Sequence, residues 1–112
     1  MAKEGGYLSQ QSTRPRTLAY GLADSPAGLA AWIIEKWRAW SDCGGELLGT
    51  YSMDELITHV MLYWTTNTIA ASSTRMYYEN TNTLPPLGYI GVPTGLALFP
   101  ADILLYRAEM DK

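Results

Sequence analysis

An aspartate and a histidine are the side chains in this sequence that pattern alone makes candidates for acid–base chemistry. Asp102 follows Leu96 to Phe99, a short apolar run between glycine and proline. An apolar run without alternation indicates a buried strand of a mostly parallel sheet, and such sheets place their sites beyond the carboxyl ends of the strands. An acid in this place is also a common turn former or helix cap, so the spacing leaves both interpretations of Asp102 open.

The histidine, His59, lies within a predicted helix, four residues after Glu55. A catalytic base needs a nucleophile within hydrogen-bonding distance, and the pattern places none beside it, so a structural role is favoured. Tyr7 follows two glycines and is typical of a partly buried ring with its hydroxyl in water. The pattern by itself assigns this tyrosine no function.

Helices are the elements predicted to position these residues. Residues 1–24 mix glycine, proline and serine with little periodicity, which predicts the end of a helix followed by a loop. Ser25 and Pro26 then begin a helix to about Trp40, since serine can cap and proline fits the first position. Six residues recur along this helix at helical spacing, and the aromatic ones indicate packing rather than a cofactor site: Leu29, Trp32, Ile33, Lys36, Trp37 and Trp40.

A second helix is predicted to start at a capping box, in which Ser52 and Glu55 accept hydrogen bonds from each other's backbone N–H groups. Residues 65–68 are threonine and asparagine, whose side chains compete for backbone hydrogen bonds, so a break or kink is expected there. A third helical stretch is expected over residues 69–79. Residues 80–88 are expected to connect without regular structure.

Composition and charge argue against several classes of protein. The chain has 112 residues, 47% of them hydrophobic, and a formal net charge of −3 without the basic cluster that nucleic-acid binding requires. Its single cysteine, Cys43, cannot form an internal disulfide, and no apolar run approaches the roughly 18 to 20 residues that cross a bilayer. No phosphate loop, zinc-ligand spacing or G-x-S-x-G motif occurs. We therefore expect a cytoplasmic, reducing compartment and no nucleic acid, membrane span, cofactor or metal.

The predicted strand also bears on whether this sequence could form a sheet by itself. A single strand cannot form a sheet by itself, so the chain either lends its strand to partners or is a piece of a larger structure. We favour the second interpretation.

Three motifs, in this order, resemble the C-terminal half of epoxide hydrolases of the microsomal type, which have the α/β-hydrolase fold. They are LADSPAGLAAWIIEKWRAW, then LYWTTNTIAASS with RMYYEN, then VPTGLALFPADIL. The resemblance extends from about Gly6 to Leu105. It implies a partial α/β-hydrolase fold: residues 1–87 form a segment of the helical cap, and residues 88–112 begin the C-terminal part of the α/β core with one core strand.

The resemblance implies a chemistry as well. Members of that family open epoxides with water to vicinal diols: an aspartate attacks a ring carbon and forms an ester, while two cap tyrosines hydrogen-bond to the ring oxygen. A histidine, oriented by an acidic residue, then activates the water that hydrolyses the ester. Because the epoxide oxygen leaves as an alkoxide, two phenols act as an oxyanion hole and can also supply the proton.

Three residues of this chain match the family's motifs. Tyr7 in GGYLSQQSTRP corresponds to the first cap tyrosine, Tyr77 in RMYYEN to the second, and Asp102 in FPADIL to the acidic residue that orients the histidine. Tyr78 is adjacent to Tyr77, and neighbours on a helix point about 100° apart, so only one of them can face the site. The motif favours Tyr77.

The family's nucleophilic aspartate and water-activating histidine lie outside the motifs present here, and no motif lets His59 substitute. The resemblance therefore implies an incomplete epoxide hydrolase, inactive alone, whose substrates are a small-molecule epoxide and water. Two alternatives stay open. One is another α/β-hydrolase such as a haloalkane dehalogenase, which does not need the tyrosine pair; the other is a non-catalytic interaction or remnant protein that keeps the cap helices as a surface.

Overall fold

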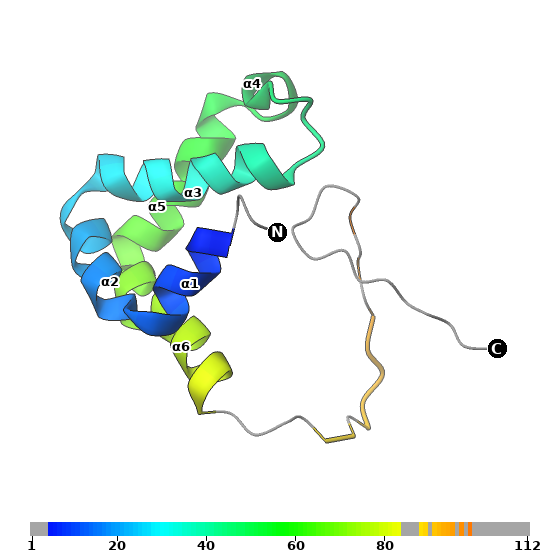
Figure 1. Cartoon of the computed structure of the whole chain (residues 1–112). Coiled ribbons are helices and arrows are strands. Elements are labelled where there is room, and N and C mark those ends of the chain that lie inside the picture. Colours follow the sequence, from blue (N-terminus) through cyan, green and yellow to red (C-terminus); the bar gives the residue numbers. More distant parts are fainter. Residues whose placement is uncertain (1–4, 84–87, 90, 96, 98, 100–112) are drawn as a thin grey trace.

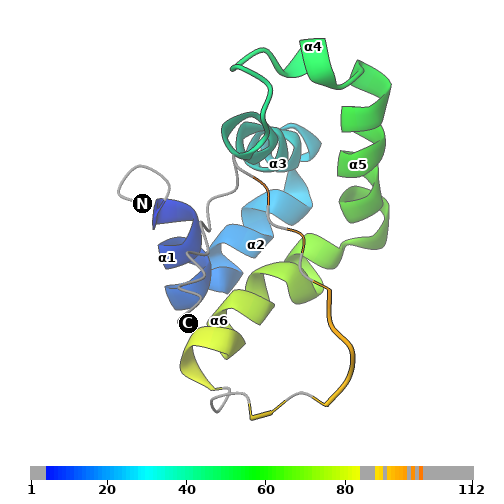
Figure 2. The same cartoon turned by 90° about the vertical axis from the view of Figure 1, so that its right-hand side faces the viewer.

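Helices make up the regular structure of this chain in a computed structural model, which describes residues 5–83, 88, 89, 91–95, 97 and 99. Their bounds are α1 Gly5–Thr13, α2 Pro15–Asp24, α3 Pro26–Trp40, α4 Leu47–Thr50, α5 Met53–Thr66, the π-helix η1 Ile69–Ser73 and α6 Thr74–Asn82. Helices α1, α2 and α6 pack side by side in both views, while α3 crosses α5 (Figures 1 and 2). The chain thus returns at α6 to the helix with which it started.

The N-terminal segment forms two helices, so the prediction of a helix end followed by a loop over residues 1–24 is wrong. Helix α1 ends at Thr13, and Pro15 starts α2, where its missing N–H costs no hydrogen bond. Helix α2 buries Ala19 and Leu22 and packs against α3 and the π-helix. This burial outweighs the modest helix propensities of glycine, serine and threonine, which dominated the prediction.

Helix α3 confirms its prediction. The Ser25 hydroxyl accepts a hydrogen bond from the Gly28 N–H at 3.0 Å, and Pro26 occupies the first helical position. Leu29 is fully buried and Ile33 almost so. The residues that recur at helical spacing in the sequence therefore form the face of α3 that packs against the rest of the molecule.

Helix α5 begins at the predicted capping box. The Glu55 N–H donates to the Ser52 hydroxyl at 3.2 Å, and the Ser52 N–H donates to the Glu55 carboxylate at 2.8 Å. The helix ends at Thr66, where Asn67 takes a left-handed conformation with φ of 53°. Both the start of this helix and the break over residues 65–68 are confirmed.

The third helical stretch is confirmed, but it begins as a π-helix and runs on to Asn82. A π-turn is wider than an α-turn. Here the buried Thr74 hydroxyl donates to the Ile69 carbonyl at 3.2 Å across that turn. The wide turn changes the rotation of α6 relative to a continuous α-helix, and so affects which α6 side chains face α1.

Two small apolar clusters hold the helices together. The first joins α2, α3, α5 and the π-helix, and the second lies where the α3–α4 connection meets α5. Their buried members are Leu22, Leu29, Ile33, Val60 and Ile69 in the first, and Cys43, Leu47 and Leu56 in the second. Helix α3 borders both, so the position of its aromatic residues is fixed from two sides.

The predicted core strand over Leu96 to Phe99 is not seen. The described residues contain no strand; Ala97 and Phe99 have no regular structure and are exposed, while residues 96 and 98 lie outside the described part. A strand needs a neighbouring strand for its backbone hydrogen bonds, and the described part supplies none. The helical arrangement fits a cap, and the division at residues 87 and 88 stays a prediction. Among the described residues, no helix is long and apolar enough to cross a membrane.

Candidate active site

Tyr7 and Tyr77 lie in contact, although they come from opposite ends of the helical part of the chain. Their ring centroids are 5.6 Å apart and the ring planes meet at 82°, which is an edge-to-face arrangement. Tyr7 is on α1 and Tyr77 is on α6, and these two helices pack along each other. The structure therefore brings two of the three predicted site residues together. Asp102 lies outside the described residues.

Polar contacts between α6 and α1 fix the relative position of the two tyrosines. The Thr81 hydroxyl donates to the Ser12 hydroxyl at 3.2 Å, and the Asn82 amide donates to the Ser12 carbonyl at 3.0 Å. Ser12 is buried. Since Thr81 lies one helical turn beyond Tyr77, these bonds hold the turn that carries Tyr77 against α1.

Helix α3 packs against the other side of Tyr7. The Tyr7 ring stacks on Trp32 with centroids 5.0 Å apart and planes at 19°, and it meets Trp40 edge-on at 5.1 Å. The Lys36 ammonium lies 5.7 Å from the centroids of both the Tyr7 and the Trp40 rings. Three aromatic contacts on separate sides leave this phenol little freedom to rotate.

A cavity of about 320 Å³, which we call the aromatic pocket, is lined by Tyr7 and by the three α3 residues around it, Trp32, Lys36 and Trp40. Its wall comes from α1, α3, α5, the π-helix and the residues that follow α3 and α4. The lining residues are Tyr7, Trp32, Ile33, Lys36, Trp37, Trp40, Ser41, Tyr51, His59, Tyr63, Ile69 and Ser73. A pocket that is mostly aromatic, with a few hydroxyls and one cation, suits a small apolar ligand with a polar end.

The environment keeps the Tyr77 phenol protonated. Burial raises the pKa of Tyr77 well above its usual value, because the phenolate would lose solvation, and the neighbouring Tyr7 hydroxyl acts in the same direction. Tyr63 adds a smaller effect of the same sign. Tyr77 therefore remains a hydrogen-bond donor at pH values where an exposed tyrosine has ionised.

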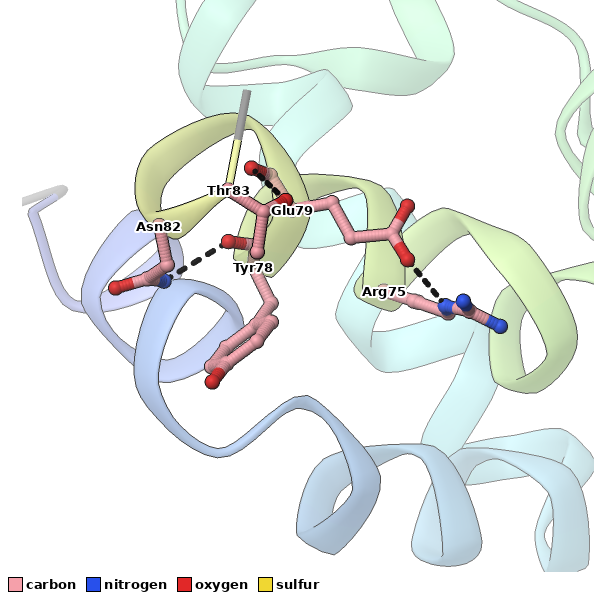
Figure 3. A network of polar contacts seen from close by, with 5 residues as sticks. All are labelled: Arg75, Tyr78, Glu79, Asn82 and Thr83. Carbon is pink, nitrogen blue, oxygen red and sulfur yellow. Dashed lines mark hydrogen bonds and ion pairs between the residues drawn. The ribbon is translucent and has the colours of Figure 1, made fainter. Parts of the chain in front are cut away.

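Tyr78 belongs to a different surface of α6. Its ring reaches toward the junction of α1 and α2, and its carbonyl accepts a hydrogen bond from the Asn82 amide at 2.8 Å (Figure 3). It lines a separate groove with Thr13 and Pro15, beside the ion pair of Arg75 and Glu79. Of the two adjacent tyrosines, the structure places Tyr77 against Tyr7.

Sequence reasoning gave no place at a site to two polar residues of the pocket wall. His59 is half-buried and its ring packs 4.5 Å from that of Trp37. Lys36 lies between the aromatic residues of α3 on the pocket side. The signal for Lys36 was present, because Trp32, Lys36 and Trp40 recur every fourth residue and so share one helix face. His59 was considered as a catalytic base, and a structural role was favoured because no nucleophile lies beside it in the pattern.

Relatives of this chain among curated protein sequences confirm the resemblance predicted from the three motifs. The chain is 43% identical over 121 aligned positions to Epoxide hydrolase 1 of Sus scrofa, covering 93% of the chain and 25% of that protein. It is 37% identical over 119 positions to Epoxide hydrolase 1 of Oryctolagus cuniculus, with the same two coverages of 93% and 25%. It is 42% identical over 86 positions to Juvenile hormone epoxide hydrolase 1 of Ctenocephalides felis, covering 71% of the chain and 18% of that protein.

The chain thus spans about a quarter of the length of its two mammalian relatives. No family model and no solved structure matches it.

Proposed function

This chain is a relative of the epoxide hydrolases over about a quarter of their length, and we propose that it supplies the oxygen-binding side of an epoxide hydrolase active site. In this proposal Tyr7 and Tyr77 both donate hydrogen bonds to the oxygen of a small-molecule epoxide. The observation that carries the proposal is the contact between these two phenols, from α1 and α6, beside the aromatic pocket.

The first step is the opening of the epoxide ring. A carboxylate from the remainder of the protein forms a bond to one ring carbon, the bond between that carbon and the ring oxygen breaks, and negative charge builds up on the oxygen. The two phenols stabilise that charge, and one of them gives its proton to the oxygen. Tyr77 is protonated before this step, and because its raised pKa makes full loss of its proton costly, its part is to donate a hydrogen bond to the oxygen.

The second step is hydrolysis of the ester. A histidine from outside this chain's motifs takes a proton from water, and the resulting hydroxide attacks the ester carbonyl, which releases the diol and restores the carboxylate. The proton on the histidine then returns to the phenolate that the first step left, so that both groups are restored. Asp102 is proposed to orient that histidine and to stabilise its charged form. By then the substrate oxygen is an ordinary alcohol, so Tyr7 and Tyr77 contribute less to this step than to the first.

The pair of phenols also distinguishes this function from that of a haloalkane dehalogenase. A halide leaves as an anion that needs no proton, whereas an epoxide oxygen remains attached to the product and must be protonated. Two phenols held edge to face can both donate hydrogen bonds to that oxygen, which suits the second task.

The proposal is tested in a chimera in which this chain replaces the matching segment of the Sus scrofa Epoxide hydrolase 1. We expect the chimera to convert styrene oxide to its diol and to leave alkyl halides unchanged. The isolated chain, which lacks the family's nucleophile motif, is the matched negative control and is expected to form no diol above background. A folded chimera that turns over halides but not epoxides would overturn the proposal.

A further inference from the structure

The wall of the aromatic pocket carries a second set of polar side chains, which the proposed reaction does not use. Ser41, Tyr51 and His59 line the pocket together with Trp37, and we call these four residues the Trp37 group. We propose that the Trp37 group binds a hydrogen-bond acceptor on the substrate, so that the preferred substrates are epoxides with a carbonyl group, such as a ketone or an ester, on their substituent. This inference rests on the proposed function.

Two helices and the connection between them hold the Trp37 group together. The Trp37 ring on α3 lies 4.9 Å from the Tyr51 ring and 4.5 Å from the His59 ring on α5, with the planes at 67° and 56°. Helices α3 and α5 pack against each other, and residues 41–52 join them through α4 (Figure 2). The rings are therefore positioned by tertiary packing and not by one mobile loop.

Ring contacts divide the pocket wall into two parts, the tyrosine pair with its tryptophans and the Trp37 group. Within residues 5–83, no ring contact joins Tyr7 to the Trp37 group. Tyr63 connects the two parts, because its ring lies 5.4 Å from that of His59 and it also acts on the pKa of Tyr77. The pocket of about 320 Å³ has the volume of roughly ten water molecules. A substrate whose epoxide oxygen meets the tyrosine pair thus has room for a substituent that reaches the Trp37 group.

The Trp37 group offers two hydrogen-bond donors. The Tyr51 hydroxyl donates to the Ser41 hydroxyl at 3.3 Å, which leaves the proton of Ser41 for another acceptor. Among the described contacts, neither ring nitrogen of His59 makes a hydrogen bond, and imidazole carries at least one N–H in either protonation state. A carbonyl oxygen has two lone pairs and can accept from both donors. A carboxylate fits less well, because aromatic side chains would replace much of its hydration.

The kinetic effect of such a contact differs from that of the tyrosine pair. A carbonyl on the substituent takes no part in the bonds that form and break, so its hydrogen bonds are as strong in the bound substrate as in the transition state. Interactions of this kind lower KM and leave kcat unchanged. One hydrogen bond of this type changes affinity by about fivefold.

The chimera allows a matched test with two series of terminal epoxides of increasing chain length. One series carries a methyl ketone at the far end of the chain, and the other has CH₂ in place of the carbonyl. His59→Phe keeps a ring and removes the N–H, whereas His59→Gln keeps an N–H donor. Ser41→Ala removes the second donor and serves as an independent variant in case His59→Phe does not fold. Thr58→Ala is the control, because Thr58 is exposed and adjacent to His59 on α5.

The measured quantity is the ratio of kcat/KM for the ketone to kcat/KM for its CH₂ counterpart. At the chain length where the parent ratio is largest, His59→Phe and Ser41→Ala are each expected to lower it by about fivefold through KM. His59→Gln and Thr58→Ala should stay within about twofold of the parent. The inference is overturned if the ratio is unchanged in folded His59→Phe and Ser41→Ala at every chain length. It is also overturned if His59→Gln loses as much as His59→Phe, because ring packing would then explain the effect.

Binding of a ketone that has no epoxide tests the site without chemistry. Calorimetry with the folded chimera should show affinity for the long-chain methyl ketone falling by about fivefold in His59→Phe, while affinity for the matching hydrocarbon stays the same. Equal affinity of parent and variant for the ketone would overturn the inference. If Tyr7→Phe leaves formation of the enzyme ester unchanged while ketone binding still depends on His59, the proposed function fails and the carbonyl site stands.

Discussion

At the scale of single residues, the properties of the site come from placing two phenols in the same partly buried space. Neither Tyr7 nor Tyr77 is unusual in the sequence. The burial of Tyr77, together with the neighbouring Tyr7 hydroxyl, raises the pKa of Tyr77 and makes its ionisation costly. Two phenols in edge-to-face contact can both offer their hydroxyls to one oxygen.

This raised pKa has a consequence for stability at high pH. The pKa of Tyr77 in the folded chain lies above the value of about 10 for an unfolded tyrosine, so the unfolded chain loses this proton first. The contribution of Tyr77 to stability is therefore complete below about pH 10 and is lost as the pH rises toward the folded pKa. Denaturant unfolding at about pH 8 and about pH 11 should show a smaller loss of stability in Tyr77→Phe than in the parent chain.

Tyr78→Phe is the control for this prediction, since Tyr78 lies on the other groove of α6. It should lose stability at high pH as the parent does. If Tyr77→Phe and Tyr78→Phe lose the same amount of stability between the two pH values, Tyr77 is not the phenol whose ionisation opposes folding.

Residue patterns could not have shown that Tyr7 and Tyr77 meet. Their contact depends on how α1 and α6 pack, and no local periodicity connects the two ends of the chain. The family resemblance nominated both tyrosines, and the structure supplies the contact between them. Lys36 was visible as a charged residue at helical spacing among tryptophans, but only the packing of Tyr7 onto α3 shows what that charge faces.

At the scale of the elements, the helices that were predicted well have strong signals at their ends. Helix α3 has a serine cap and a proline, and α5 has a complete capping box. Helices α1, α2 and α4 lack side-chain caps of this kind among the described contacts and contain glycine or threonine. Helices α1 and α2 form because other helices pack against them, and propensity does not record that burial.

The capping box of α5 gives a direct test of this view. Ser52→Ala removes the hydroxyl that accepts from the Glu55 N–H, and it should reduce the free energy of unfolding by about 1 kcal/mol. Thermal or denaturant unfolding followed by circular dichroism would measure the loss. Thr58→Ala, at an exposed position in the middle of the same helix, should change stability by less than about half of that amount. If the two variants lose equal stability, the cap does not determine where α5 begins.

At the scale of the whole molecule, the helices leave apolar side chains uncovered. Several large ones on α4 and α5 are at least 42% exposed: Leu48, Met53, Ile57, Met61 and Leu62. On α5, Met53, Ile57 and Met61 recur every fourth residue and so form one apolar stripe. A contiguous apolar stripe of this kind favours association.

We therefore expect the isolated chain to associate as its concentration rises, with a broad thermal transition. Sedimentation velocity over a range of concentrations measures the association. Ile57→Lys places a charge in the centre of the stripe and should shift the distribution toward the monomer, whereas the same change at the exposed Thr58 beside it should not. A monodisperse monomer with a sharp, cooperative transition would contradict the view that these helices belong to a larger structure.

The central claim is that Tyr7 and Tyr77 together stabilise the oxygen of an opening epoxide, and single-turnover kinetics in the chimera test it most directly. Each of Tyr7→Phe and Tyr77→Phe should slow ester formation by on the order of 10²-fold or more, while ester hydrolysis changes less. The double variant should lose less than the product of the two single losses, because the remaining phenol can move toward the oxygen and the pair acts as a unit. Tyr78→Phe, on the other groove, should react as the parent does. Ester formation that is unchanged in both Tyr7→Phe and Tyr77→Phe, or that is slowed only in Tyr78→Phe, would contradict the claim.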